Sequence, residues 1–283
     1  MKYLKLVRLN NIKKNIVIFL PLVFSGELLE INFSTIYELV IASIYFYLVS
    51  INVYIMNDYF DKFEDAEHPI KKFRVIASGD ITNVEIFITL TTNLILTFSI
   101  FSVFNYLNKI NLIIFLYLLN NIVYNLLFKK INITLASTSI AFGFVLRVFI
   151  GGIIGNVEIN FWLPLFVFLS TFIVSTLKKI NDTKDISKYY YFKKRSNKIL
   201  SLILILYIVH LLMVISLENF NEVIFLTFLN IFLSFKVINL IFKKFLESLS
   251  PIDPLDLFKF NSVTLTFVLW AITYLQIRYL ILT

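Results

Sequence analysis

The chain has 283 residues, of which 59% are hydrophobic, and it carries 26 Lys and Arg against 18 Asp and Glu. Soluble domains are about 45–50% apolar, so this composition excludes a soluble protein with one anchor and indicates a polytopic membrane protein. The net charge of +8 is typical of residues that flank membrane helices, and we expect no nucleic-acid partner. Because cysteine is absent, disulfides and thiolate metal sites are excluded.

Nine apolar segments, each near the ~20 residues that cross ~30 Å of hydrocarbon, predict an all-α polytopic membrane protein with nine transmembrane helices. We expect these helices at Lys14–Leu29, Ser34–Met56, Val84–Tyr106, Asn111–Phe128, Ile133–Ile154, Phe161–Leu177, Lys198–Leu217, Glu222–Ile241 and Phe260–Leu282. The connections are not rich in Pro, Gly or Ser, so residues 1–283 are expected to form a single integral-membrane domain.

Positive charge marks alternate connections along the chain. Most Lys and Arg residues lie in the N-terminal arm and after the second, fourth, sixth and eighth segments, whereas the other connections are mostly acidic. This asymmetry predicts that the N-terminus and the polar loops face the cytoplasm and that the C-terminus lies outside. An odd number of spans fits this alternation, and the cell (inner) membrane is the expected location.

An acidic motif follows the second segment. If that helix continues past Met56, then Asp58, Asp61 and Asp65 fall within about 100° of Asn57 on one face. Carboxylates this close repel one another unless a cation lies among them, and Mg²⁺ binds one or two carboxylates together with phosphate oxygens. The motif therefore predicts a Mg²⁺ site with catalytic aspartates, and the alternative is a solvated helix end.

A basic segment follows the aspartates. We expect His68-Pro69 to end the helix, because the residue before proline disfavours the α conformation. Lys71, Lys72 and Arg74 come next, and Arg74 is the strongest candidate for a phosphate ligand because a guanidinium can bind phosphate with two hydrogen bonds. The alternative is that these cations only mark the cytoplasmic side. His68 is expected either to contact substrate or to cap the helix.

A second polar motif closes the sixth segment. Lys178 and Asp182 are four residues apart on one helix face, so they form either a surface ion pair or a second half-site in which Lys178 and Lys179 contact phosphate. In that half-site Asp182 would orient a hydroxyl group or a metal.

Other polar candidates lie within or beside the apolar segments. Arg147 falls inside the fifth segment, where an ionised group faces a cavity or a partner, so it meets either a lipid phosphate or an acidic side chain. Tyr124 and Lys129 end the fourth segment on the side of the first motif. Lys14 begins the first helix there, where a phosphate would gain free backbone donors.

With these residues in view, the chain resembles the UbiA superfamily of intramembrane transferases, over nearly its whole length. That family carries the pattern Asn-Asp-x-x-Asp-x-x-x-Asp, which is met here by Asn57, Asp58, Asp61 and Asp65. The basic segment is most similar to the decaprenyl-phosphate phosphoribosyltransferase branch, through His68-Pro69, Lys71-Lys72, Arg74 and Ile76-Ala77-Ser78-Gly79. Departures from that branch are Lys72 for Arg, Val75 for Pro, and Asp182 for Glu.

The resemblance implies nine helices around a cavity that opens to the cytoplasm. It also implies the reaction, in which a polyprenyl phosphate attacks C1 of 5-phosphoribosyl diphosphate and diphosphate leaves, with Mg²⁺ as cofactor. The expected partners are these two substrates and the bilayer, with a homo-oligomer possible. A phosphate monoester is already anionic at neutral pH, so the nucleophile needs no strong base.

Two other functions stay open at this point. A UbiA-type prenyltransferase would move a prenyl group from prenyl diphosphate to an aromatic acceptor, although its second motif normally carries two aspartates, and Asp182 and Asp185 fit this spacing poorly. A transporter of a phosphorylated solute is the non-enzymatic alternative. Transporters usually show Gly- or Pro-broken helices at mid-membrane, and these are scarce here.

Overall fold

The computed structural model describes residues 2–25, 31–68, 71–101, 107–181 and 205. Within these ranges all regular structure is helical, as the sequence predicts. Packing divides the chain into two compact units, one of residues 1–22, 27–130 and 146–158, and the other of residues 23–26, 131–145 and 159–283. The seventh, eighth and ninth predicted helices lie outside the described residues, so the count of nine and the single domain stay predictions.

The N-terminal segment differs from the single helix that the sequence predicts at Lys14–Leu29. It forms α1 (Lys2–Val7), the 3₁₀ helix η1 (Leu9–Phe19) and α2 (Leu20–Ser25). Arg8 separates α1 from η1 with a left-handed backbone, φ 52°. Pro21 lies in the first turn of α2, directly after η1, and has no N–H to donate to the carbonyls of the preceding 3₁₀ turn.

The second predicted helix is confirmed and is longer than expected. Helix α3 runs from Phe33 to Phe60 and α4 from Lys62 to Glu67, followed by the 3₁₀ turn η3 (Lys71–Phe73). The assumption of one continuous helix through Asp65 is wrong, because Asp61 interrupts it with φ −88° and ψ 0°. His68 has an extended backbone before Pro69 and ends α4, as predicted.

The remaining described helices match the third to sixth predicted segments. They are α5 (Asn83–Phe101), α6 (Leu107–Val123), α8 (Ile133–Gly155) and α9 (Trp162–Asn181). Helix α6 continues into one π-helical turn, η4 (Tyr124–Phe128), and then into the short α7 (Lys129–Ile131). This π turn has no counterpart in the prediction, because hydropathy does not distinguish it from an α-helical turn.

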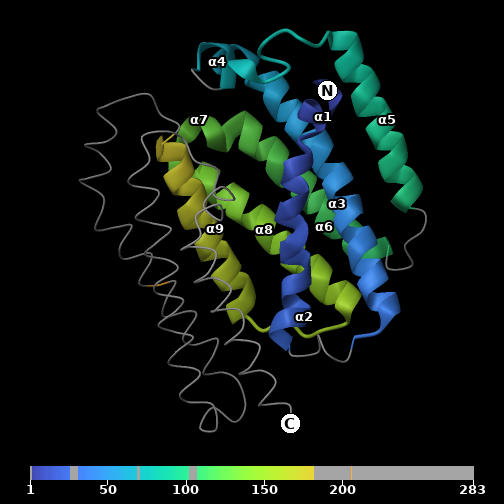
Figure 1. The fold of residues 1–283 in the computed structure, drawn as a ribbon. Coiled ribbons are helices and arrows are strands. Elements are labelled where there is room, and N and C mark those ends of the chain that lie inside the picture. Colours follow the sequence, from blue (N-terminus) through green and yellow to red (C-terminus); the bar gives the residue numbers. More distant parts are fainter. Residues whose placement is uncertain (1, 26–30, 69–70, 102–106, 182–204, 206–283) are drawn as a thin grey trace, which may run out of the picture. The chain divides into compact units, whose positions relative to one another are not determined.

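Helix α3 is the centre of the first unit, and it packs against η1, α5 and α6 (Figure 1). One of its faces enters a core shared with η1, α2, α6 and the end of α8, which includes Phe46, Val53 and Tyr117. The opposite face, with Tyr47, Ile51 and Ile55, packs on α1, the turn after η3 and the start of α5. Burial on both faces holds the C-terminal end of α3, where the aspartates lie, in a fixed place.

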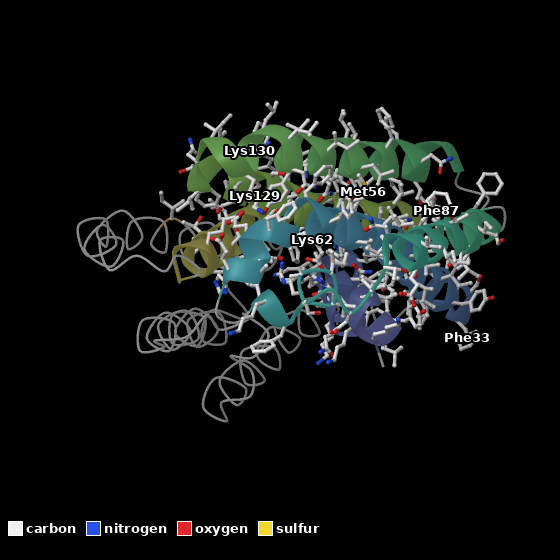
Figure 2. All side chains as sticks on the ribbon, turned by 90° about the horizontal axis from the view of Figure 1, so that it is seen from above. Phe33, Met56, Lys62, Phe87, Lys129 and Lys130 are labelled. Atoms are coloured by element: carbon white, nitrogen blue, oxygen red, sulfur yellow. The ribbon has the colours of Figure 1, made fainter. Side chains whose placement is uncertain are left out.

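The periphery of this unit is apolar. Phe87 of α5 is 70% exposed and Phe33 at the start of α3 is 84% exposed, and Figure 2 shows both at the outside of the helices. Four described helices are long and apolar enough to cross a membrane: Phe33–Phe60, Asn83–Ile100, Ile110–Ile131 and Ile133–Gly155. Large exposed apolar faces on such helices are expected where lipid replaces water.

Candidate active site

The first acidic motif lies where α3 meets α4. Asp58 is in the last turn of α3, Asp61 is the break between the helices, and Asp65 is on α4. Asp58 and Asp65 are seven residues apart, about two helical turns, so they lie on the same side and both contact one basic side chain. Both Asp58 and Asp65 are almost completely buried, at 6% and 3% exposure. Buried carboxylates of this kind require cationic or hydrogen-bonding partners.

Arg74 joins two of the aspartates. Its Nη1 donates to Asp58 Oδ1 at 3.1 Å and to Asp65 Oδ2 at 2.6 Å. The segment from Lys71 to Arg74 therefore folds back onto the acidic motif, where Arg74 pairs with two carboxylates. Gly79 has φ 80° in the turn that follows, which glycine adopts without strain.

A second arginine reaches Asp58 from the N-terminal arm. Arg8 Nη2 forms an ion pair with Asp58 Oδ1, so this oxygen accepts from both Arg8 and Arg74. The Arg8 guanidinium and the Lys14 ammonium also lie 5.7 and 5.5 Å from the centre of the Tyr54 ring. Lys14 is thus placed on the same side of α3 as Asp58, one turn of helix deeper.

The end of α6 and its continuation contact the motif from another side. Lys129 Nζ pairs with Asp61 Oδ1 and lies 3.8 Å from Glu64 Oε2. Asn125 donates its side-chain N–H to Asn57 Oδ1. Figure 2, which looks down on this end, shows Lys129 on the helix next to the α3–α4 junction that Lys62 marks. Tyr124 opens the same π-helical turn.

His68 acts as a local cap in this structure. Its Nδ1 accepts the backbone N–H of Lys71 at 3.2 Å, which holds the turn after α4. This contact caps the 3₁₀ turn η3, whereas a contact of His68 with substrate stays a prediction. Lys71 lies close enough to Asp65 to act on its carboxylate electrostatically.

Burial raises the pKa of the Asp65 carboxyl above its ordinary value near 3.8. The Arg74 cation and its hydrogen bond oppose this effect, and the negative charge of Asp61 adds to it. Desolvation disfavours the charged form of a carboxyl group, and a neighbouring like charge acts in the same direction. Negative charge on Asp65 is therefore disfavoured unless a cation is close.

Arg147 lies apart from the aspartates. It is 3% exposed on α8, and its Nε donates to Asn15 Oδ1 at 2.9 Å. Its guanidinium lies 4.4 Å from the centre of the Phe46 ring and 5.4 Å from that of Tyr117. Phe46 precedes Asp58 by twelve residues, or about 18 Å along α3. Arg147 is therefore held deep in the bundle by an amide and two aromatic rings.

The second predicted motif is described only in part. Lys178 and Lys179 form the basic last turn of α9, as expected, but Asp182 lies outside the described residues. Its proposed pairing with Lys178 stays a prediction.

The donor atoms of the first motif fit Mg²⁺ in kind. Asp58, Asp61 and Asp65 offer carboxylate oxygens and Asn57 offers an amide oxygen, and hard oxygen ligands are those that Mg²⁺ prefers. Among the described residues, however, no three carboxylate or imidazole groups converge on one metal position, and the aspartates are ion-paired with arginine or lysine. The motif therefore fits a Mg²⁺ ion that binds one or two of these carboxylates.

Sequence reasoning missed two members of this site. Arg8 was assigned only to the basic N-terminal arm, and its distance of 50 residues from Asp58 gave no local sign of contact. Asn125 was overlooked although it lies four residues before Lys129, a spacing that puts two polar side chains near one another on an otherwise apolar helix.

Comparisons with known proteins bear on this geometry. The model of the UbiA prenyltransferase family matches residues 19–244. A UbiA homologue from Archaeoglobus fulgidus, solved bound to GPP and Mg²⁺, is 16% identical, with 99% of each chain covered and a TM-score of 0.68. The same homologue has been solved with DMAPP and Mg²⁺.

A solved digeranylgeranylglyceryl phosphate synthase is 18% identical, with 98% of this chain and 97% of that chain covered and a TM-score of 0.58. No curated protein sequence matches significantly. At these identities the structural likeness shows the fold, which agrees with the expected UbiA architecture. Together with the apolar helices it indicates an integral membrane protein. Because the family model covers most of the sequence, this chain belongs to the UbiA prenyltransferase family.

Proposed function

We propose that this protein transfers the 5-phosphoribosyl group from 5-phosphoribosyl diphosphate to a polyprenyl phosphate and releases diphosphate. The observation that carries the proposal is the contact of Arg74 with both Asp58 and Asp65. It supports a site in which the basic segment His68–Arg74, the part of the sequence that most resembles the phosphoribosyl branch, works together with the acidic motif. We place the reaction at the cytoplasmic face of the inner membrane.

In this reaction a phosphate oxygen of the lipid forms a bond to C1 of the ribose, while the bond from C1 to the diphosphate oxygen breaks and its electron pair leaves with diphosphate. The leaving group gains negative charge as this bond stretches. Arg74, Lys71 and Lys129 lie around the motif and would stabilise that charge. The lipid phosphate is already anionic, so the attack requires no proton transfer to the protein.

Mg²⁺ is part of the proposal, since relatives of the same fold were solved with Mg²⁺ and prenyl diphosphates. Asp58, Asp61 and Asp65, with Asn57, would hold it. When bound, it would neutralise negative charge on the diphosphate. The ribose C1 becomes positively charged in the transition state, and a carboxylate of the motif that is not occupied by the metal would stabilise it.

Prenyl transfer is the second candidate function. The family model and the GPP- and DMAPP-bound homologue favour a prenyl diphosphate as donor. The acidic motif serves either donor equally well, because both release diphosphate. The basic segment and Lys178-Lys179 are the features that favour the phosphoribosyl donor, whose 5-phosphate needs additional cations.

The deciding experiment supplies purified protein with Mg²⁺, ribose-labelled 5-phosphoribosyl diphosphate and a polyprenyl phosphate. Ribose label that becomes extractable into organic solvent supports phosphoribosyl transfer. In a parallel reaction the same preparation receives labelled GPP and an aromatic acid. Label that stays aqueous in the first reaction, with prenylated acid in the second, would overturn the proposal in favour of prenyl transfer.

A further inference from the structure

The carboxylate of Glu85 ties the N-terminal segment 2–8 to the start of α5. Its Oε1 accepts hydrogen bonds from Lys2 Nζ at 2.6 Å and from the Tyr3 hydroxyl at 2.8 Å. Its Oε2 accepts the backbone N–H of Thr82 at 3.0 Å and the Thr82 hydroxyl at 3.1 Å. One side chain therefore serves two elements, with one oxygen on segment 2–8 and the other on the cap of its own helix.

Segment 2–8 is held by a carboxylate at each end. Lys2 pairs with Glu85 at the beginning of α1, and Arg8 pairs with Asp58 directly after α1. The sequence has no acidic residue before Glu27, so the cations of this segment find their partners on other helices. The two ion pairs thus connect α1 to α5 on one side and to α3 on the other.

Helix α1 is seated on α3 between these two pairs by one buried side chain (Figure 1). Leu6 is 2% exposed and lies in a cluster with Ile86 of α5, whereas Leu4 is 59% exposed. The Tyr47 hydroxyl donates to the carbonyl of Val7 at 2.8 Å. A helix of six residues is unstable by itself in water, so the place of α1 depends on these contacts.

The backbone at Arg8 marks where this segment can turn. Its φ of 52° lies in the left-handed region, which residues other than glycine seldom adopt, and it separates α1 from η1. Such a conformation persists where surrounding contacts hold it. Here the guanidinium contacts Asp58 and the Tyr54 ring. Release of α1 would let Arg8 return to a more favourable conformation, so this residue is the hinge.

We propose that segment 2–8 is a strap, hinged at Arg8 and fastened at Glu85, whose closed state holds Arg8 on Asp58. In the open state α1 leaves its seat on α3, and Asp58 Oδ1 keeps Arg74 as its partner. Glu85 acts on Asp58 through the strap and is therefore a positioning residue. The strap does not rest on the proposed function, because it follows from the contacts of segment 2–8 alone.

The test uses the lack of cysteine in this chain, which makes a single introduced thiol a unique reporter. Leu6→Cys, in the purified full chain in nanodiscs, places that thiol under the closed strap, where a water-soluble maleimide reaches it only after opening. Glu85→Gln in this background keeps the cap of α5, since glutamine also serves at this helix position, but removes the charge that pairs with Lys2. Its labelling is expected to be at least about threefold faster.

Controls separate the strap from general effects of charge. Glu158→Gln removes an exposed negative charge after α8, and Lys13→Gln removes an exposed positive charge beyond the hinge. Both are expected to label like Leu6→Cys alone. Leu4→Cys should label rapidly in every background and so reports the reactivity of the maleimide. High salt should speed labelling of Leu6→Cys and have little effect once Glu85 is replaced, because it screens an exposed ion pair.

A strap held at both ends differs from a frayed terminus in its response to Arg8→Gln. This change removes the pair with the buried Asp58 and is expected to speed labelling of Leu6→Cys about tenfold. Fraying from the N-terminus would respond to Glu85→Gln alone, and this result would overturn the proposal. Unchanged labelling in Glu85→Gln would also overturn it.

Ile86→Cys gives a second reporter that leaves α1 intact, since Ile86 is 6% exposed in the same cluster. It should be protected in the wild-type background and should respond to Glu85→Gln and Arg8→Gln in the same order. If both Leu6→Cys and Ile86→Cys labelled as fast as Leu4→Cys in the wild-type background, the closed strap would not exist.

The strap also predicts a response to Mg²⁺, and this part rests on the proposed metal site. A cation on Asp58 Oδ1 competes with Arg8, so Mg²⁺ should open the strap and an open strap should favour Mg²⁺. At constant ionic strength Mg²⁺ is expected to speed labelling of Leu6→Cys, but not in the Asp58→Asn background. Labelling that ignores Mg²⁺ would overturn this link. The readout is independent of turnover, so it stays informative even if ribose transfer is not observed.

Discussion

Arg147 donates its Nε–H to Asn15 Oδ1 over 2.9 Å, and both side chains are almost completely buried. Asn15 in turn donates to the carbonyl of Ser43 on α3 at 2.8 Å. A single amide thus connects η1, α3 and α8 in the apolar part of the bundle. The amide is a partner of Arg147 that the sequence analysis did not consider, and the two alternatives given there, a lipid phosphate and an acidic side chain, stay predictions.

Replacing Asn15 with leucine is expected to destabilise the protein by about 2 kcal/mol, because the buried Arg147 guanidinium loses a hydrogen bond that water cannot replace. The measurement is the midpoint of thermal unfolding in detergent. Asn10→Leu changes an exposed asparagine of the same 3₁₀ helix and should leave the midpoint almost unchanged. Equal midpoints for the two variants would show that the Arg147 contact does not contribute to stability.

Gly151→Ala is expected to be the most disruptive single substitution in α8. A Cβ atom at this position would lie 1.8 Å from the carbonyl oxygen of Ile18, which is backbone and cannot rotate away. The helices must separate, so we expect a loss of more than about 3 kcal/mol or a failure to assemble. The purified yield and the size-exclusion elution profile in detergent show whether the variant assembles.

Gly155→Ala is the matched control. There the nearest atom to the new Cβ is Leu22 Cδ2 at 3.1 Å, the far end of a flexible side chain. We expect an assembled protein with a small change in thermal midpoint. If Gly151→Ala assembled as well as Gly155→Ala, the close approach of η1 and α8 would be incorrect.

Asp58→Asn and Asp61→Asn are expected to lower turnover by about 10²-fold or more while the protein stays folded. Each change keeps the shape of the side chain and removes a negative charge that would hold Mg²⁺ opposite the leaving diphosphate. The assay is the transfer of label from 5-phosphoribosyl diphosphate to lipid. Glu64→Gln changes an exposed carboxylate, 79% accessible, and should retain most activity. Wild-type rates in both aspartate variants would remove these residues from the mechanism.

The raised pKa of Asp65 predicts a pH dependence of stability. Between the two pKa values the folded chain keeps the proton on Asp65, whereas the unfolded chain has released it. The protonated carboxyl therefore stabilises the fold below the unfolded pKa, and this stabilisation is lost as the pH rises through the folded pKa. The asparagine side chain in Asp65→Asn is neutral at every pH, so this variant does not lose that stabilisation. Its thermal midpoint relative to wild type should therefore rise as the pH increases from below the ordinary carboxyl pKa near 3.8 through the raised pKa of Asp65.

Arg74→Gln tests the same effect from the other partner, because it leaves the Asp65 carboxyl in place and removes the neighbouring cation. Arg74 lowers the pKa of Asp65 through its charge and its hydrogen bond, so its removal should move the pH transition to higher values. The comparison requires midpoints of wild type and Arg74→Gln over the same pH series. A transition that stays in place would mean that Arg74 does not act on Asp65.

The long apolar helices among the described residues were largely predictable because apolar runs alternate with polar connections. Helix α8, expected at Ile133–Ile154, runs from Ile133 to Gly155. The acidic and basic motifs could be located for the same reason, since charged groups are rare in such a chain. The interruption at Asp61 was not predictable, because neither proline nor glycine lies at that position or beside it.

The partners of the charged side chains were the least predictable part. Asp58 is contacted by Arg74, sixteen residues away, and by Arg8, fifty residues away. Helical periodicity tells which residues share a face, but not which distant helix a face meets. The acids of the motif lie at one helix junction, whereas their role as Mg²⁺ ligands stays a prediction. The cations that pair with them could be identified only from tertiary packing.

The π-helical turn at Tyr124–Phe128 lies directly before Lys129. A π turn contains one residue more than an α turn and covers about the same rotation. Asn125 and Lys129 therefore come almost a full revolution apart and contact neighbouring residues, Asn57 and Asp61. A relative with one residue fewer here would form a plain α-helix and would still bring its lysine to the acidic end of the bundle.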